Sequence, residues 1–274
     1  MKENNKEDSA EMFTFARDSY LDRTSRPVYA LTYLIGFILL YEIGTILISQ
    51  EVLVESLAGK EIRVVSFEWI KSLLSDYLNF PARLAWITTP LMVVVILLAL
   101  QITSRKPWKV RALDFVPMTI ESNILAVPLI VLCMLINRTT VDQIAVLSNA
   151  ATNHGLAVSL VTGIGAGIYE ELVFRLILIS FLMLVFQDFI GMTRKSSIIL
   201  SVVISAFLFS LHHHVFFIDG GITTGEPFVW SVFIFRMAAG VYFAAIFAVR
   251  GFGIAVGTHA FYDILVAVLN FWAE

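Results

Sequence analysis

The chain has 274 residues, of which 58% are hydrophobic and only 15% charged, and its formal net charge is −3. Soluble domains carry about 25% charged residues, so the composition excludes an ordinary soluble globule. The single cysteine, Cys133, excludes a disulfide framework and a cysteine-rich zinc site. The charge balance gives no basic surface for nucleic acid. Long apolar runs instead predict an all-α, polytopic integral membrane helix bundle.

Residues 1–28 carry charges of both signs and no apolar core of a signal peptide. Two interpretations remain open for this tail. Apolar side chains between Met12 and Leu21 predict a short helix at the membrane surface, and a solvated tail is the alternative.

The apolar segments predict seven transmembrane helices, at residues 29–49, 83–103, 116–137, 155–187, 196–214, 228–249 and 251–272. The fourth segment is long for one span and contains three glycines, so a division there would give eight. The connection 50–82 places apolar residues at helical spacing between Val64 and Leu78. This pattern predicts an amphipathic helix over the outer mouth of the bundle.

The basic residues outside the spans predict the orientation. Twelve Lys and Arg lie on the side of the N-terminus and five on the opposite side, which favours a cytoplasmic N-terminus. The chain then divides into a tail (1–28), two helices with their amphipathic connection (29–114) and a membrane core that carries the chemistry (115–274).

Ionisable side chains within membrane spans are costly and therefore indicate internal pairing or function. Glu170, Glu171 and Arg175 lie on one predicted helix. Glu171 and Arg175 are four residues apart and share a face, so this pair is interpreted as structural and Glu170 as chemical. The alternative is that arginines, including Arg236, satisfy both carboxylates.

The next ionisable cluster lies further along the chain, where His212, His213 and His214 end one span. His259 and Asp263 are four residues apart on the last span, so their side chains share a face. Carboxylate and imidazole groups are the ligands that suit zinc, and they also suffice for general-base activation of water. Either interpretation predicts hydrolysis in a pocket within the bilayer. Glu42 and Glu121 also lie in predicted spans, where they either pair with other groups or line the cavity.

Three motifs occur in order: Glu170-Glu171-Leu172-Val173-Phe174-Arg175 (EExxxR), Phe209-Ser210-Leu211-His212-His213 (FxxxH) and His259-Ala260-Phe261-Tyr262-Asp263 (HxxxD). With these motifs, residues 115–272 resemble the type II CAAX prenyl endopeptidase family, also called the CPBP or abortive-infection family of intramembrane metalloproteases. HExxH, GxSG and GxGD motifs of other intramembrane proteases are absent from the sequence.

The resemblance implies an intramembrane endopeptidase whose substrate is a prenylated tail, a leader peptide or another membrane-associated peptide. It also implies that Glu170 and His213 activate water, while His259 and residue 263 stabilise the oxyanion. Glu171 and Arg175 complete the motif set. The resemblance leaves open whether a metal takes part.

Position 263 departs from the family, which commonly has Asn there, because an ionised Asp263 would repel an oxyanion. Asp263 must then be protonated, orient His259 or bind a metal. The four groups of Glu170, His213, His259 and Asp263 favour a divalent metal, with zinc first, beside a metal-free mechanism. Two other functions stay open: a non-catalytic scaffold or self-immunity protein of the same family, and a proton-coupled transporter.

Overall fold

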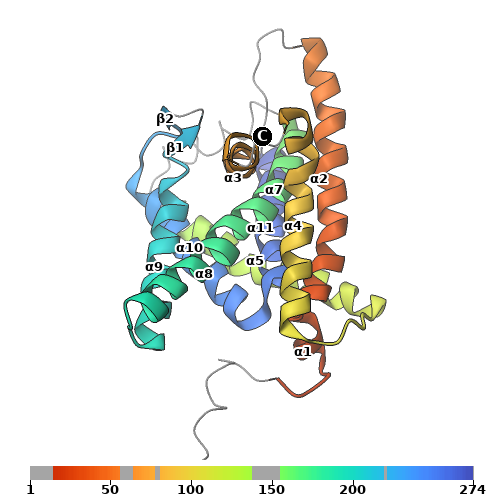
Figure 1. Ribbon diagram of the computed structural model, residues 1–274. Helices are drawn as coiled ribbons and strands as arrows, with labels where there is room; N and C mark the ends of the chain where they lie inside the picture. Colours follow the sequence, from red (N-terminus) through yellow and green to blue (C-terminus); the bar gives the residue numbers. More distant parts are fainter. Residues whose placement is uncertain (1–14, 56–63, 78–80, 138–154, 219–220, 274) are drawn as a thin grey trace, which may run out of the picture.

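The computed structural model describes residues 15–55, 64–77, 81–137, 155–218 and 221–273. They form a helical bundle, as the hydropathy predicts (Figure 1). The long helices are α2 (Pro27–Glu55), α4 (Ala82–Ser104), α5 (Phe115–Asn137), α9 (Arg194–Leu211), α10 (Trp230–Arg250) and α11 (Phe252–Ala273), together with a continuous helix over residues 155–189.

Six of the described helices are long and apolar enough to cross a membrane, and Thr89–Ser104 of α4 adds a shorter apolar helix. The chain is therefore a multi-pass integral membrane protein. Large apolar side chains face outward along α5, including Ile120, Ile124 and Val131. In water such a surface would be unfavourable, but in a bilayer it is the lipid-facing side of the helix.

The long helix consists of α7 (Gly155–Glu171), the π-helical segment η3 (Leu172–Leu178), α8 (Ile179–Met183) and a second π-helical segment, η4 (Leu184–Phe189). It runs without interruption, so this segment contributes one helix and not two. Widened π turns inside α-helices often occur at functional sites. Here η3 begins directly after Glu171, at the first motif.

Glycines of α7 face neighbouring helices instead of breaking α7. A Cβ on Gly167 would lie 2.8 Å from the backbone nitrogen of Ala260, and a Cβ on Gly163 would lie 2.7 Å from Cβ of Asp263. Because only glycine permits this approach, the backbones of α7 and α11 can pack closely. This packing brings the first motif beside the third.

Shorter elements lie at the two ends of the bundle (Figure 1). One end has α1 (Tyr20–Thr24), before α2, and η2 (Ala112–Asp114), before α5. The other end has α3 (Val65–Ser72), η1 (Leu73–Tyr77) and an antiparallel hairpin of β1 (Val215–Ile218) and β2 (Gly221–Thr224). The amphipathic helix expected in 50–82 is present as α3 and η1. The hairpin was not predicted, since α9 ends at Leu211 and not at residue 214.

Buried ion pairs fix the end of the bundle near α1. Arg23 pairs with Asp114 at 2.8 Å, and Arg250 donates to Glu121 at 2.9 Å. The hydroxyl of Tyr20 donates to the same Glu121 carboxylate. These contacts tie the first described helix to η2, to α5 and to the end of α10. Of the predicted surface helix, residues 12–14 lie outside the described part, and the observed helix begins at Tyr20.

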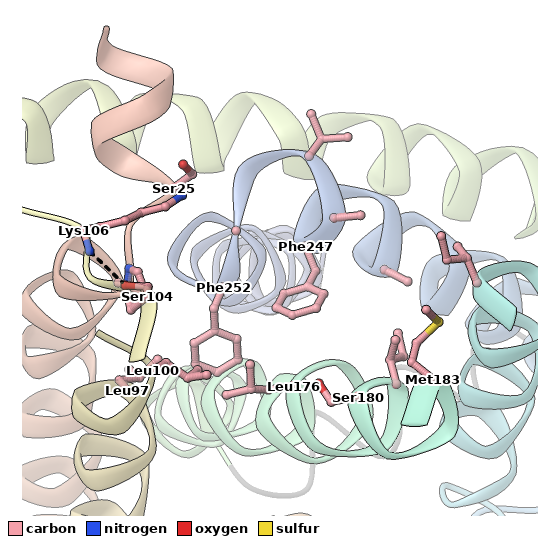
Figure 2. A pocket seen from close by; sticks show the side chains of 18 of the residues that line it. Ser25, Leu97, Leu100, Ser104, Lys106, Leu176, Ser180, Met183, Phe247 and Phe252 are labelled. Carbon is pink, nitrogen blue, oxygen red and sulfur yellow. Dashed lines mark hydrogen bonds between the residues drawn. The ribbon is translucent and has the colours of Figure 1, made fainter. Parts of the chain in front are cut away.

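A cavity of about 680 Å³ lies between helices on the α1 side (Figure 2). Leu176, Phe247 and Phe252 point into it, with Lys106 and Ser25 near one end. Among the described residues that line this cavity, none belongs to the three motifs. The cavity is therefore separate from the cluster described next.

Candidate active site

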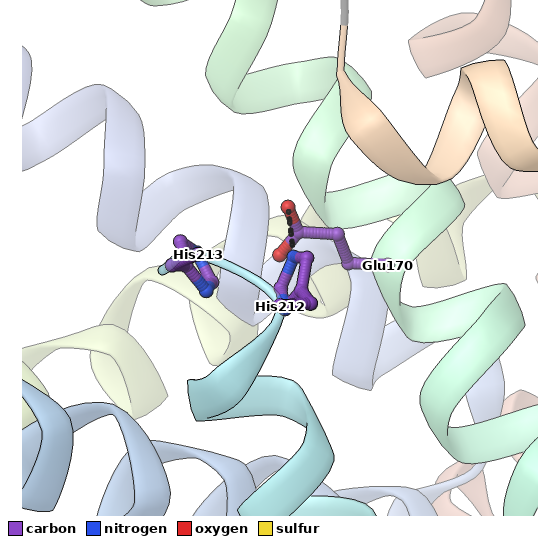
Figure 3. Close-up of side chains that lie close together, drawn as sticks. All are labelled: Glu170, His212 and His213. Carbon is purple, nitrogen blue, oxygen red and sulfur yellow. Dashed lines mark ion pairs between the residues drawn. The ribbon is translucent and has the colours of Figure 1, made fainter. Parts of the chain in front are cut away.

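A buried carboxylate lies between imidazoles from two other helices. Glu170 comes from the end of α7, and its Oε1 lies 3.4 Å from Nε2 of His212, which follows α9 (Figure 3). Its Oε2 lies 3.8 Å from Nε2 of His259 on α11. Glu170 and both histidines are 6% exposed or less. The chain thus concentrates acid and base groups where water is scarce, which strengthens their interactions.

Both His212 and His213 are oriented by one carbonyl group. Each ring places Nδ1 against the carbonyl oxygen of Phe209, which can only accept, so each Nδ1 donates. The Nε2 atoms then carry the free lone pairs. Burial lowers the pKa of His213, and the nearby His212 and Arg236 lower it further. Its ring is therefore neutral at neutral pH, the form that accepts a proton or binds a metal.

Glu171 holds the third imidazole. Its Oε1 lies 2.7 Å from Nδ1 of His259 and 3.1 Å from Nη1 of Arg175. The Glu171 and Arg175 side chains are fully buried, and the ring of Phe209 lies 4.1 Å from the Arg175 guanidinium carbon. The predicted ion pair is present, and it has a second function: it anchors His259 so that Nε2 points toward Glu170.

Phe243 of α10 fixes the plane of the His259 ring by stacking on it at 4.5 Å, with 14° between the planes. Asp263 lies one turn further along α11, with Oδ2 3.6 Å from Nε2 of His259. The structure therefore gathers all six predicted site residues in one cluster. His213 packs on His212 with ring centroids 4.0 Å apart, and one of its ring nitrogens lies within 4.8 Å of a Glu170 carboxylate oxygen.

The residues can accommodate a divalent metal. Ligand atoms of Glu170, His212 and His213 lie within 4.8 Å of one another. Two imidazoles with Nδ1 held by a backbone carbonyl are the arrangement seen in metal-ligating histidines. Among the described residues this is the cluster with metal-binding geometry. It contains Glu170 and His213, as the motifs predicted, and it has His212 in place of His259 and Asp263.

Residues 152–265 match the model of a family described as Type II CAAX prenyl endopeptidase Rce1-like. This segment belongs to that family. It contains all three motifs and the helix between the second and third, so the resemblance is confirmed over this range. Comparisons with curated proteins and with solved structures find no match.

The site contains contacts that the sequence did not predict. His212 makes the direct contact with Glu170, and a triplet of adjacent histidines gives no sign of which ring turns inward. Trp69 of α3 packs against His212 with ring centroids 5.9 Å apart, which places the amphipathic helix over this site. Arg236 binds Glu226, just after the hairpin, at 2.8 Å.

The other two glutamates in spans are paired. The hydroxyl of Tyr169 donates to Glu42 at 3.3 Å, and Glu121 accepts from Arg250 and Tyr20. Neither lies in the cluster around Glu170.

Proposed function

We propose that the protein is an intramembrane endopeptidase that hydrolyses a peptide presented at the membrane, with Glu170 as the group that activates water. The observation that carries this proposal is the carboxylate of Glu170 between Nε2 of His212 and Nε2 of His259. A buried carboxylate next to two oriented imidazoles can take a proton from water and return it to the leaving amine.

The residues around Glu170 have the remaining roles in proton transfer and in stabilising the transition state. His212 and His213 present Nε2 lone pairs beside Glu170, so either can share the proton. His259, anchored by Glu171 and Phe243, presents Nε2 on the other side of that carboxylate. From there a protonated His259 can donate to the oxygen that becomes negative in the transition state. Arg175 neutralises Glu171 and keeps it in place.

Glu170, His212 and His213 would hold a divalent metal, with zinc the best match for this ligand set. A bound zinc lowers the pKa of water and so supplies hydroxide at neutral pH. His259 and Asp263 then remain outside the inner ligand set. The same residues without a metal give a glutamate–histidine mechanism.

The substrate class follows from location. The site lies within a helical bundle whose outer surface is apolar, so a peptide must reach it from the bilayer or from the end covered by α3. A prenylated tail and a membrane-associated leader peptide both satisfy this requirement. The family match supports a peptide over an ion as substrate.

The experiment compares wild type with Glu170→Gln in cells, by mass spectrometry of new peptide termini among membrane proteins. The proposal predicts termini present with wild type and absent with Glu170→Gln, while both proteins reach equal amounts in the membrane. A cellular phenotype that is equal for both chains would instead favour the scaffold or self-immunity function. Proton-coupled uptake into vesicles would favour the transporter.

A further inference from the structure

The cavity on the α1 side requires an apolar occupant. Its volume of about 680 Å³ lies within the range of pockets that hold small ligands. An empty apolar cavity lowers stability in proportion to its volume, and water does not fill a cavity whose walls offer it few polar partners. Because the medium around this helical bundle is lipid, the occupant expected in the apolar part of the cavity is an acyl chain.

The walls of this part come from several elements. They include Leu176 of η3, Met183 of α8, Phe247 of α10 and Phe252 of α11. Figure 2 shows Phe252, Leu176 and Phe247 between Lys106 at one end and Met183 at the other. An occupant would therefore lie between helices and not on the surface of one, with a charged group near one end.

Two cations line the cavity: Lys106, just after α4, and Arg194, at the start of α9. The carboxylate among the described lining residues is that of Asp22, which pairs with Arg26 at 2.6 Å. The lining thus has a positive charge that Asp22 does not cancel. Both cations stand at helix ends, at the level of lipid headgroups, on the side that the sequence predicts to be cytoplasmic. Basic pockets between transmembrane helices on that side suit anionic headgroups.

We propose that this cavity binds an anionic phospholipid, with an acyl chain along Leu176, Phe247 and Phe252 and the negative headgroup attracted by Lys106 and Arg194. This inference does not depend on the proposed function. A ligand that binds only the folded chain raises its stability, so the lipid would act as a structural component of the bundle.

The bound chain would also support the active site from behind. Leu176 directly follows Arg175, the partner of Glu171. Phe247 lies one turn after Phe243 on α10, and Phe243 stacks on His259. The two segments that hold the first and third motifs are therefore also walls of the lipid cavity.

The test uses the full chain purified in detergent, with phosphatidylglycerol and phosphatidylcholine of identical acyl chains as probes and native mass spectrometry as readout. Wild type is expected to retain phosphatidylglycerol at lower lipid concentration than phosphatidylcholine, and phosphatidylglycerol should raise its unfolding temperature. Lys106→Gln and Arg194→Gln should each weaken phosphatidylglycerol binding about fivefold and leave phosphatidylcholine binding unchanged. Lys109→Gln is the matched control, because Lys109 is an exposed lysine of the same connection that does not line the cavity.

A second pair of variants tests the position of the acyl chain. Ala248 of α10 lines the cavity, whereas Ala245, three residues earlier, does not, and both are exposed. Ala248→Phe takes space from about two methylene groups, so both phospholipids should bind at least about tenfold more weakly. Ala245→Phe should match wild type. Glycerol 3-phosphate, which has the phosphate but no acyl chain, should not compete.

Gel filtration of every variant separates misfolding from lost binding. Equal retention of the two phospholipids by wild type, or equal effects of Lys106→Gln and Lys109→Gln, would overturn the selection of an anionic headgroup. Unchanged retention by Ala248→Phe, or competition by glycerol 3-phosphate, would overturn binding of the acyl chain in the cavity. Glu170→Gln should bind lipid as wild type does, so these results are separate from the test of the protease function.

Discussion

Nδ1 of His259 and Oε1 of Glu171 lie 2.7 Å apart in a site where neither side chain is more than 5% exposed. The two residues are 88 positions apart in the chain, and they meet because α7 and α11 pack through glycines. Glu171 also pairs with Arg175. One carboxylate thus joins an ion pair to an imidazole that faces the reacting groups, which is why the second glutamate of the EExxxR motif matters.

Substitution of Glu171 is expected to affect both stability and activity. Glu171→Ala leaves the buried Arg175 without its partner, at a cost of about 3–5 kcal/mol. Glu171→Gln keeps the shape but loses the charge that orients His259, and activity should fall about 10–100-fold.

Thermal unfolding in detergent and a cleavage assay in liposomes measure these two effects. Glu68→Gln is the control, because its partner Lys71 is partly exposed and such pairs contribute about 1 kcal/mol or less. A Glu171→Gln chain with wild-type activity would show that His259 needs no anchor.

The close packing of α7 on α11 predicts that an alanine at position 167 is harmful. Its Cβ would lie 2.8 Å from the backbone nitrogen of Ala260, so the two helices must move apart, at about 1–3 kcal/mol. The motion also separates Glu170 from His259, and catalytic geometry tolerates little displacement.

Gly36→Ala is the matched control for this glycine, because its Cβ would meet nothing within 4 Å. Alanine should be neutral or stabilise α2 by about 0.5–1 kcal/mol. The same unfolding and cleavage measurements apply to both variants. Equal behaviour of Gly36→Ala and Gly167→Ala would contradict the close approach of the two helices.

If the site binds zinc, substitution of His212 should reduce the zinc content of the protein more than substitution of His214. His212→Ala removes a ligand and should abolish zinc retention, measured by elemental mass spectrometry of the purified protein. His214→Ala is the control, because His214 lies two residues later and is also buried, but its Nδ1 bonds to the backbone carbonyl of Glu226. Equal zinc in the two variants would exclude His212 as a ligand. Full activity in a strong chelator would indicate the metal-free mechanism.

Much of the bundle could be predicted from hydropathy, because every helix that crosses the lipid needs about 20 consecutive apolar residues. The segment 116–137 was predicted within a residue of α5, Phe115–Asn137. The hairpin at Val215–Thr224 was missed, since a short paired segment next to apolar helices has no comparable signal. The alternative of a division within 155–187 did not occur, because its glycines face neighbouring helices.

The candidate site was predicted in part. The four-residue spacing identified Glu171 with Arg175 and His259 with Asp263, because local helix geometry decides such pairs. The contact of Glu171 with His259 and the pairing of Arg236 with Glu226 depend on how separate elements pack. Periodicity within one helix contains no such information. The cytoplasmic position of the N-terminus stays a prediction.

The most direct measurement is hydrolysis in H₂¹⁸O by the purified protein in liposomes, with membrane-derived peptides as substrate and mass spectrometry as readout. The account predicts new carboxyl termini that carry ¹⁸O with wild type and none with Glu170→Gln, although both proteins are folded. Glu42→Gln, which alters a glutamate paired with Tyr169 outside the cluster, should give the wild-type result. Labelled termini in equal amounts with wild type and Glu170→Gln would contradict the central claim.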